Sequence, residues 1–477
     1  MKRREFLESA AAAGAYIAVP RLMRGETTTP VTIKIDTSRA LHTVPSNFTG
    51  LSYESSQLAH PQFFTAQNAE LIALVKQLSP GGVLRIGGNT SEYTHWVPKA
   101  SDTTEAGFAE PPSNGRNTAE SYTITPAAVT NLRGFLDATN WQVLYGLNLH
   151  HGTPESAAEE ADFVVKTMGP RLLAFQFGNE PDWFHNDDPK HTRWTYEDYF
   201  TRWQLYFKAV RDRIPDAPIA GPDIATEFSW VTRFAEQTRG EIVLLTGHYY
   251  VGSGKNNPKM TLETLMQPPQ HLADEVAVVM PAARIAGVPY RMSEGNSAFL
   301  GGKPGVSDVF ASALWAADYM LQMAQVGYAG VNLHGGGEGI YTPIATDHDG
   351  VSTARPIFSG MLLAEEFAGA KLLETSLRTG GANVTAYSGT KNGELLLAVF
   401  NKGDRPVAVR ADGITGWKST SESRHSSAKV WTLSAPALDS KRGVSFAQTA
   451  AAKRPELFGK GHSLAVAAYS GVLVKFS

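Results

Sequence analysis

The stretch LLAFQFGNEPDWF, residues 172–184, has the pattern of a buried strand that ends on polar residues. Its first six residues are almost all apolar, which is typical of a strand covered on both faces. Gly178 and Pro181 then mark a turn around Asn179 and Glu180. A carboxylate at such a strand end is either a structural ion-pair partner or a working acid, and the rest of the chain has to distinguish these two roles.

Seven further apolar runs have the same character, and they cover residues 48–53, 83–88, 142–149, 218–223, 242–250, 289–294 and 329–335. Amphipathic stretches such as 66–79, 196–214 and 307–327 lie between them, with apolar residues at helical spacing. Eight strands that alternate with seven or eight helices predict an α/β fold, a (β/α)8 TIM barrel, over residues 46–368.

The character of the chain changes after residue 368. Residues 369–477 contain short strand-like runs separated by Gly, Asn, Asp and Ser turns, which predicts a C-terminal antiparallel β-sandwich domain. Residues 29–45 include the strand-like run VTIKID, residues 31–36, which we expect to join that sandwich.

The first 28 residues have the order of features found in an export signal. Arg3 and Arg4 precede Glu5-Phe6-Leu7, and an Ala-rich, weakly apolar stretch follows. We therefore expect residues 1–28 to be a twin-arginine-type signal and the protein to be periplasmic or extracellular, with an ordinary basic helix as the alternative. No other segment is long and apolar enough to cross a membrane.

Composition excludes several classes of function. Charged residues make up 19% of the 477 residues, the formal net charge is −3, and no run of five to eight Lys and Arg occurs, so nucleic acid is not an expected partner. The chain has no cysteine, which excludes disulfides, thiolate metal sites and cysteine nucleophiles. His150 and His151 lack a third ligand at suitable spacing, so we expect no metal and no cofactor.

The active site of a TIM barrel lies at the carboxyl ends of its strands. Two carboxylates there stand out, Glu180 after the fourth predicted strand and Glu294 after the seventh. Two carboxyl groups about 5–5.5 Å apart are what a retaining glycosidase uses, one as nucleophile and one as acid and base. The remaining polar residues at these ends are Glu54, Asn89, Thr90, His150, His151, Asn179, Asp223, His248, Tyr249, Tyr250 and His334.

These residues carry a resemblance to known families. Asn179-Glu180-Pro181 resembles the Asn-Glu-Pro signature of clan A glycoside hydrolases, and Glu294 in RMSEGNS resembles the nucleophile of that clan. LSPGGVLRIGGNTSEY, residues 78–93, and SAFLGGKPGVSDVF, residues 297–310, are similar to segments of glycoside hydrolase family 79, the β-glucuronidase and heparanase family.

The resemblance implies a role for each catalytic residue. Glu180 would be the acid and base, and Glu294 the nucleophile. Asn179 would bind the sugar 2-hydroxyl, and Tyr250 would hold the nucleophile in place. Arg85 is expected to be an ion-pair partner in the structure around the site, and His248 an ordinary histidine at the rim of the barrel.

The resemblance also implies a set of substrate-binding residues. Glu54 and Asn89 would bond sugar hydroxyls at the far end of the pocket. Tyr341, with backbone N–H groups near Gly302 and Gly339, would bind the substrate carboxylate.

The function implied is a retaining exo-β-glucuronidase that acts on a glucuronic-acid-containing glycoside or oligosaccharide through a covalent glycosyl-enzyme. Three alternatives stay open. An endo-acting, heparanase-like enzyme is disfavoured by the lack of basic clusters and of an excisable spacer. Another clan A activity, such as a xylosidase or arabinofuranosidase, would keep both glutamates, and a non-catalytic carbohydrate-binding barrel would normally lose one.

Overall fold

The computed structural model describes eight ranges of the chain, residues 30–99, 121–185, 193–254, 256–335, 339–347, 349–415, 427–453 and 463–476. The predicted export signal, residues 1–28, lies outside these described residues. Within them, none of the helices combines the length and the apolar character that a membrane crossing requires.

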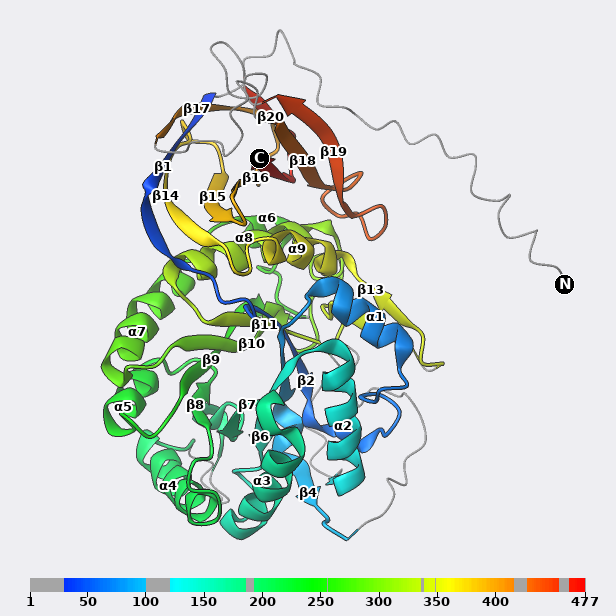
Figure 1. The fold of residues 1–477 in the computed structure, drawn as a ribbon, viewed down its shortest axis with the longest axis vertical. Coiled ribbons are helices and arrows are strands. Elements are labelled where there is room, and N and C mark those ends of the chain that lie inside the picture. The colour runs from blue at the N-terminus through cyan, green and yellow to red at the C-terminus, as the bar shows by residue number, and fades with distance from the viewer. Residues whose placement is uncertain are drawn as a thin grey trace, which may run out of the picture.

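A closed barrel of eight parallel strands forms the centre of the protein (Figure 1). Its order around the ring is β10-β11-β2-β3-β6-β7-β8-β9, so each strand lies beside its neighbours in the chain. Each apolar run predicted as a barrel strand corresponds to one of these eight, which confirms the predicted fold class. The strands are β2 (Thr49–Glu54), β3 (Val83–Gly87), β6 (Gln142–Leu147), β7 (Leu172–Phe177), β8 (Ile219–Ile224), β9 (Leu244–Ser253), β10 (Tyr290–Phe299) and β11 (Gly330–His334).

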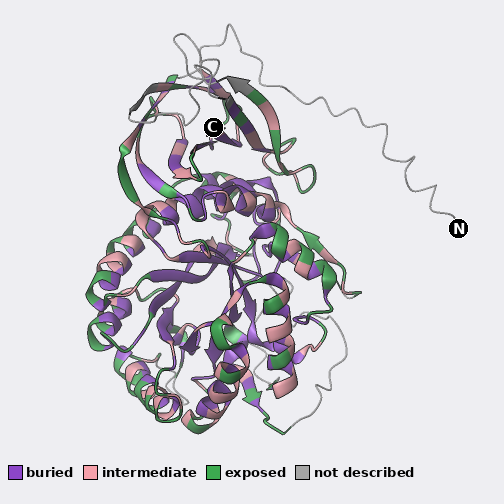
Figure 2. Ribbon diagram, viewed as in Figure 1, coloured by how far each residue is buried: buried purple, intermediate pink, exposed green. Residues whose placement is uncertain are grey.

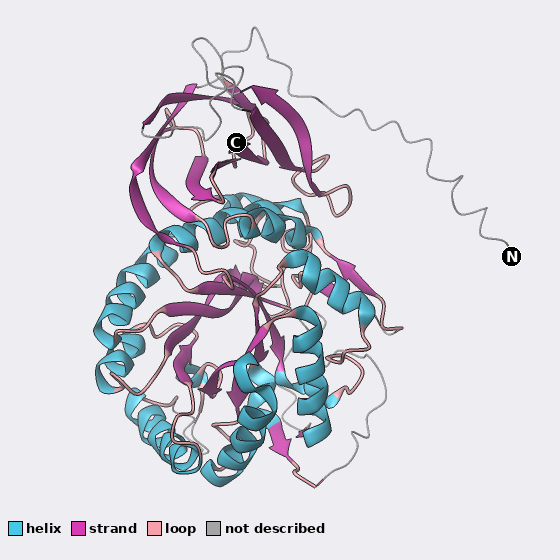
Figure 3. Ribbon diagram, viewed as in Figure 1, coloured by secondary structure: helices cyan, strands magenta, loops and turns pink. Residues whose placement is uncertain are grey.

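Helices surround the barrel and bury its outer surface, and their own outer faces are exposed (Figures 2 and 3). Local sequence fixes where several of them begin, because Thr125, Thr153 and Thr195 cap helices by accepting a bond from a backbone N–H group. The helices are α1 (Ala69–Leu78), α2 (Pro126–Thr139), α3 (Pro154–Met168), α4 (Tyr196–Arg213), α5 (Ser229–Gln237), α6 (Leu262–Met266), α7 (Gln270–Ala286), α8 (Phe310–Val326) and α9 (Pro356–Glu365).

Short elements occupy the connections around the barrel. Four are 3-10 helices, and two pairs of short strands form β4–β5 and β12–β13. These elements are η1 (Ser55–Ala59), η2 (Asn89–Tyr93), η3 (Gly169–Arg171), η4 (Pro181–Trp183), β4 (Thr94–Trp96), β5 (Tyr122–Ile124), β12 (Ile344–Thr346) and β13 (Ser352–Ala354).

The C-terminal region is one hydrogen-bonded sheet of nine strands that curls around its own apolar core (Figure 3). The N-terminal strand β1 takes part in it, antiparallel to β14 and parallel to β17. The order is β19-β18-β21-β16-β15-β14-β1-β17-β20. The strands are β1 (Pro30–Thr43), β14 (Lys371–Arg378), β15 (Val384–Lys391), β16 (Glu394–Asn401), β17 (Val407–Thr415), β18 (Ser427–Ser434), β19 (Ser445–Lys453), β20 (Leu464–Val466) and β21 (Ser470–Phe476).

A buried carboxylate joins the curled sheet to the barrel helices. Asp318 on α8 pairs with the Lys402 ammonium at 2.5 Å and accepts bonds from the hydroxyls of Thr385 and Tyr387. Removal of one partner from a buried ion pair leaves an uncompensated charge, so this contact ties the two parts of the chain together.

Candidate active site

The predicted site residues gather at the carboxyl ends of the barrel strands. Glu54 ends β2, Tyr250 and Glu294 lie in β9 and β10, and Asn89 begins η2 directly after β3. Glu180 follows β7 in a turn of positive φ. The structure thus brings together side chains from five separate strand ends.

The two predicted catalytic carboxyls approach each other closely. One carboxylate oxygen of Glu180 lies within 4.8 Å of one of Glu294. Glu180 has a left-handed backbone, with φ of 53°, and its backbone N–H donates to the Asp223 carbonyl at 2.9 Å. A non-glycine residue in this conformation persists only where its surroundings fix it, as this bond does.

The Glu294 carboxylate is held in its ionised form. Arg85 Nη1 donates to its Oε2 at 2.5 Å, and Tyr250 Oη donates to its Oε1 at 2.8 Å. Burial alone would raise the pKa of Glu294, but the charges of His334, His248 and Arg85 and the Tyr250 bond lower that pKa to about 2. The group is therefore a carboxylate at neutral pH, as a nucleophile must be.

The pKa of the Glu180 carboxyl is shifted in the opposite direction to that of Glu294. Burial raises its pKa above the usual range, and the negative charge of Glu294 adds to that rise, although a bond from His248 opposes it. Two nearby carboxyls whose pKa values move apart are the pattern expected of one acid and one base.

His248 is more than an ordinary histidine at the rim, so that expectation was wrong. Its Nδ1 lies 2.9 Å from Glu180 Oε1, and its Nε2 lies 3.3 Å from Asp223 Oδ2. Burial would lower the pKa of His248, but the charges of Asp223 and Glu294 raise it to about 10. The ring is therefore a cation that bridges the Glu180 carboxyl and the Asp223 carboxylate.

Arg85 is an ion-pair partner, as expected, and it contacts the site directly. Its Nη2 donates to Asn179 Oδ1 and to Asp223 Oδ2, both at 2.7 Å. Asp223 is buried, which would raise its pKa, yet Arg85 and His248 hold that pKa well below the usual range. One guanidinium therefore orients an amide and two carboxylates.

The residues predicted to bind sugar hydroxyls lie next to these groups. Because Asn179 Oδ1 accepts from Arg85, its Nδ2 is left as the donor, and Nδ2 contacts Asn89 Oδ1 at 3.3 Å. The Glu54 carboxylate accepts the Thr90 backbone N–H at 2.9 Å and the Thr90 hydroxyl at 2.7 Å. These contacts fix the direction in which each side chain can meet a ligand.

The structure brings Tyr341 into the same site. Its buried ring lies 6.3 Å from the ring of Tyr250 and 5.8 Å from that of His334. Gly339 packs against Tyr341 so closely that an added Cβ would lie 2.9 Å from the ring. Gly302 has φ of 94°, a conformation that favours glycine. Residues 336–338, between β11 and Gly339, lie outside the described part of the chain.

The Glu180, His248 and Glu294 side chains are close enough to suggest a metal site. Their chemistry does not fit one, because a protonated imidazole offers no lone pair and the Arg85 guanidinium already occupies Glu294. The cluster is better described as a network of alternating charges.

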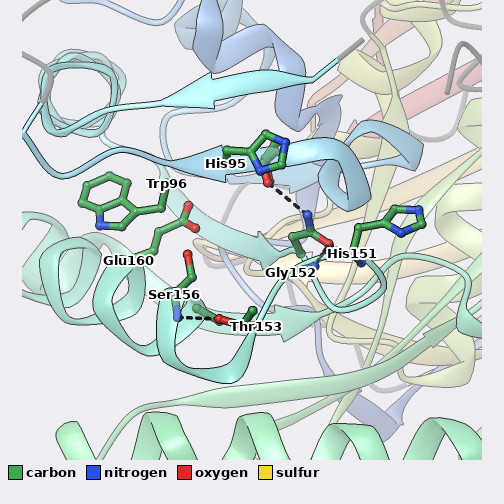
Figure 4. A pocket seen from close by; sticks show the side chains of 10 residues that line it. His95, Trp96, His151, Gly152, Thr153, Ser156 and Glu160 are labelled. Carbon is green, nitrogen blue, oxygen red and sulfur yellow. Dashed lines mark hydrogen bonds between the residues drawn. The ribbon is translucent and has the colours of Figure 1, made fainter. Parts of the chain in front are cut away.

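A separate cavity lies between β4 and the beginning of α3 (Figure 4). Of the polar residues predicted at the strand ends, His151 lines it, and neither Glu180 nor Glu294 does. Its buried carboxyl is Glu160, whose pKa burial raises to about 7 although the Tyr145 hydroxyl donates to it at 2.7 Å. The lining residues are Thr94, His95, Trp96, Asn148, His151, Gly152, Thr153, Ser156, Ala157 and Glu160.

One buried residue beside the site was not predicted as functional from the sequence. Glu92 accepts the backbone N–H groups of Leu149, His150 and Asn179, which are far away along the chain. It lies in the stretch 78–93, but no local sequence pattern predicts contacts between residues that are so far apart in the chain.

Two known proteins are similar to this chain in sequence. No protein-family model matches the chain. It is 25% identical over 348 residues to a β-glucuronidase of Aspergillus niger, a match that covers 65% of this chain. That match spans 61% of the Aspergillus protein, less than two thirds of its length. A Neurospora crassa β-glucuronidase is 25% identical over 394 residues, which cover 74% of this chain and 68% of that protein.

Solved structures with the same fold include a 4-O-α-L-rhamnosyl-β-D-glucuronidase of Fusarium oxysporum 12S. It is 19% identical, with a TM-score of 0.71, and the match covers 93% of this chain and 99% of that one. An α-L-arabinofuranosidase of Thermotoga maritima is 14% identical, with a TM-score of 0.67 and coverage of 93% and 99%. The resemblance to β-glucuronidases that was inferred from the sequence is therefore confirmed, and the barrel with an added β-domain is the fold that these glycosidase structures share.

Proposed function

We propose that this protein is a retaining exo-β-glucuronidase, a glycoside hydrolase that releases terminal β-linked glucuronic acid. The observation that carries the proposal is the pair formed by Glu180 and Glu294. Their carboxylate oxygens approach within 4.8 Å, and their surroundings drive their pKa values in opposite directions. That separation favours direct attack by a carboxylate over attack by a water molecule held between the two groups.

In the first step, the ionised Glu294 carboxylate attacks the anomeric carbon. Protonated Glu180 gives its proton to the glycosidic oxygen, the bond between that oxygen and the anomeric carbon breaks, and the leaving group departs as an alcohol. The product is a glycosyl ester on Glu294. Tyr250 and Arg85 support the attack because they orient both oxygens of the nucleophile.

In the second step, Glu180 acts as a base. Formation of the ester removes the negative charge of Glu294, which was one cause of the raised pKa of Glu180. Glu180 then accepts a proton from water, the water oxygen bonds to the anomeric carbon, and Glu294 leaves as a carboxylate. Two inversions at the same carbon give overall retention.

The substrate class is proposed from the relatives and from the residues around the catalytic pair. Both curated relatives are β-glucuronidases, and a structural neighbour is a rhamnosyl-glucuronidase. In this proposal Asn179, Asn89 and Glu54 would bond sugar hydroxyls, and Tyr341, whose ring lies 6.3 Å from that of Tyr250, would donate its hydroxyl to the substrate carboxylate. Exo action is proposed because the sequence has no basic cluster that would hold an anionic polymer.

We also propose that residues 1–28 export the folded protein by the twin-arginine route. Residues 46–368 would then be the catalytic barrel and residues 369–477 an accessory β-domain. Fusion of residues 1–28 to a reporter that needs this route, with an Arg3→Lys, Arg4→Lys control, tests the signal.

The function is tested by hydrolysis of 4-nitrophenyl β-D-glucuronide. The matching β-glucoside, β-xyloside and α-L-arabinofuranoside are tested in parallel as substrates. NMR identifies the anomer that is released first. We expect turnover of the glucuronide with glucuronic acid appearing first as the β-anomer. First release of the α-anomer would refute retention. Turnover of a neutral glycoside alone would refute the substrate class, and cleavage of internal bonds in a glucuronic-acid polymer would refute exo action.

A further inference from the structure

Glu92 is a buried carboxyl that is surrounded by hydrogen-bond donors. It lies in η2 and is 3% exposed. Its Oε1 accepts the Asn179 backbone N–H at 2.8 Å, and its Oε2 accepts those of His150 at 2.7 Å and Leu149 at 3.0 Å. The Ser91 hydroxyl lies 3.0 Å from Oε1. Three of these four donors are backbone groups of other loops.

These bonds connect three β/α connections of the barrel. Glu92 follows β3, Leu149 and His150 follow β6, and Asn179 follows β7. The loop after β6 is also held by Arg202 on α4, which donates to the carbonyls of Leu149, His150 and Gly152 at 2.6–3.1 Å. The Glu92 carboxyl thus accepts the N–H groups of this loop, and the Arg202 guanidinium donates to its carbonyl groups.

The position of Asn179 determines the position of the predicted general acid. Glu180 is the next residue, in a left-handed conformation between the end of β7 and η4. His150 stacks on Phe184 at 4.3 Å, so the loop after β6 also supports the far end of the same turn. Glu92 therefore bonds the backbone of Asn179, which precedes the acid. It also bonds the backbone of His150, whose ring packs on Phe184 after the acid.

We propose that Glu92 is a positioning residue that holds Asn179 and the general acid Glu180 in register with the glycosidic oxygen. This inference rests on the proposed function, because it assigns Glu92 an effect on proton donation to the leaving group. A neutral amide at this position presents one acceptor oxygen and one NH2 group. The NH2 group would face backbone N–H donors, so at least one bond is lost and the turn moves.

The consequence for catalysis depends on the leaving group. Departure of 4-nitrophenolate needs little protonation, whereas phenolate needs a well-placed acid. A displacement of about 1 Å can cost about 100-fold in rate. We expect Glu92→Gln to lower kcat/KM for phenyl β-D-glucuronide by about 10- to 100-fold and for the 4-nitrophenyl substrate much less.

Glu160 supplies a matched control (Figure 4). Burial raises the pKa of both carboxyls to about 7, and Glu160 lies on α3, the helix that follows β6. Glu160 accepts a hydrogen bond from the Tyr145 hydroxyl, not from a backbone group of the site. Glu160→Gln should therefore keep the wild-type ratio of the two kcat/KM values.

The experiment measures both substrates with wild type, Glu92→Gln, Glu92→Asp and Glu160→Gln, with circular dichroism to verify folding. Asp retains the charge but is one methylene shorter, so we expect the ratio of the two kcat/KM values to lie between those of wild type and Glu92→Gln. The Asp variant replaces Glu92→Gln in the test if the latter does not fold. Equal losses on both substrates, or no loss, in a folded Glu92 variant would overturn the proposal.

Amide hydrogen exchange provides a readout that does not need activity. Exchange at Leu149, His150 and Asn179 should accelerate in Glu92→Gln and stay unchanged in Glu160→Gln. A wild-type protein inactive on glucuronides would refute the proposed function alone. Unchanged protection of these three amides would overturn the role of Glu92, whatever the activity.

Discussion

Replacement of Tyr250 by phenylalanine removes one hydrogen bond from the Glu294 carboxylate and leaves the other contacts of that carboxylate in place. The Tyr250 hydroxyl donates to Glu294 Oε1 at 2.8 Å, while Arg85 holds Oε2. A hydrogen bond to an ionised group contributes about 1.5–3 kcal/mol. One pH unit corresponds to about 1.4 kcal/mol, so loss of the bond should raise the pKa of Glu294 from about 2 to between about 3 and 4.

The sign follows from the role proposed for Glu294. The nucleophile works only as a carboxylate. The value of kcat/KM is therefore highest above the pKa of Glu294 and falls as the pH is lowered through that pKa. A higher pKa therefore moves the acid limb of the pH profile upward by about one to two pH units. The assay is initial-rate hydrolysis of 4-nitrophenyl β-D-glucuronide from pH 2.5 to 9, with recovery of activity at pH 6 measured after each exposure.

Tyr319→Phe is the control for this measurement. Tyr319 lies on α8, is buried, and its hydroxyl has no hydrogen-bond partner among the described residues. This substitution should leave the acid limb where it is in the wild type. An acid limb that stays in place, or moves to lower pH, in folded Tyr250→Phe would refute the assignment of Glu294 as the ionised nucleophile.

Three further predictions concern the catalytic pair, His248 and the buried pair Asp318–Lys402. Glu180→Gln and Glu294→Gln should each nearly abolish turnover of the glucuronide with an unchanged circular dichroism spectrum, and near-normal activity in either variant would remove that residue from the mechanism. His248→Gln removes a cation that lowers the pKa of both glutamates, so both limbs of the kcat/KM profile should move to higher pH, and a downward move of either limb would contradict the charge network. Asp318→Asn leaves the buried Lys402 ammonium without its anion and should lower the free energy of unfolding in urea by about 3–5 kcal/mol. A change no larger than that of an exposed pair such as Lys208–Asp212 would show that the buried pair does not stabilise the fold.

The barrel could be predicted from the sequence because its strands are buried on both faces. Burial of this kind produces apolar runs that end abruptly on polar residues, as LLAFQF does at Gly178. The strand ends then identified Glu180, Glu294 and Tyr250 without any knowledge of distances. That β1 joins the C-terminal strands was expected from the sequence. Its parallel pairing with β17 within a single curled sheet was not, because no local pattern specifies the pairing of segments that are hundreds of residues apart.

The network around the catalytic pair could not be predicted in the same way. His248 reaches Glu180 across 68 residues of chain, and Glu92 reaches Asn179 across 87. No periodicity links such residues, and a histidine in an apolar strand has the same local pattern whether it bridges two carboxylates or only fills space. Their roles depend on closure of the barrel, which places strand ends opposite each other that are distant in the chain.

The division of labour between the two glutamates also depends on that closure. Glu180 comes shortly after β7 and precedes Pro181, and Glu294 lies within β10 and precedes Gly295, so the local sequence does not say which is the acid. Arg85 decides between them, because its guanidinium donates to Glu294 and to Asp223, and its hydrogen bonds among the described residues do not reach Glu180. The cation that does reach Glu180 is His248, and its other nitrogen faces Asp223 at 3.3 Å. Asp223 thus takes part of the positive charge that would otherwise ionise Glu180, and burial can then raise the pKa of that carboxyl while Glu294 stays charged.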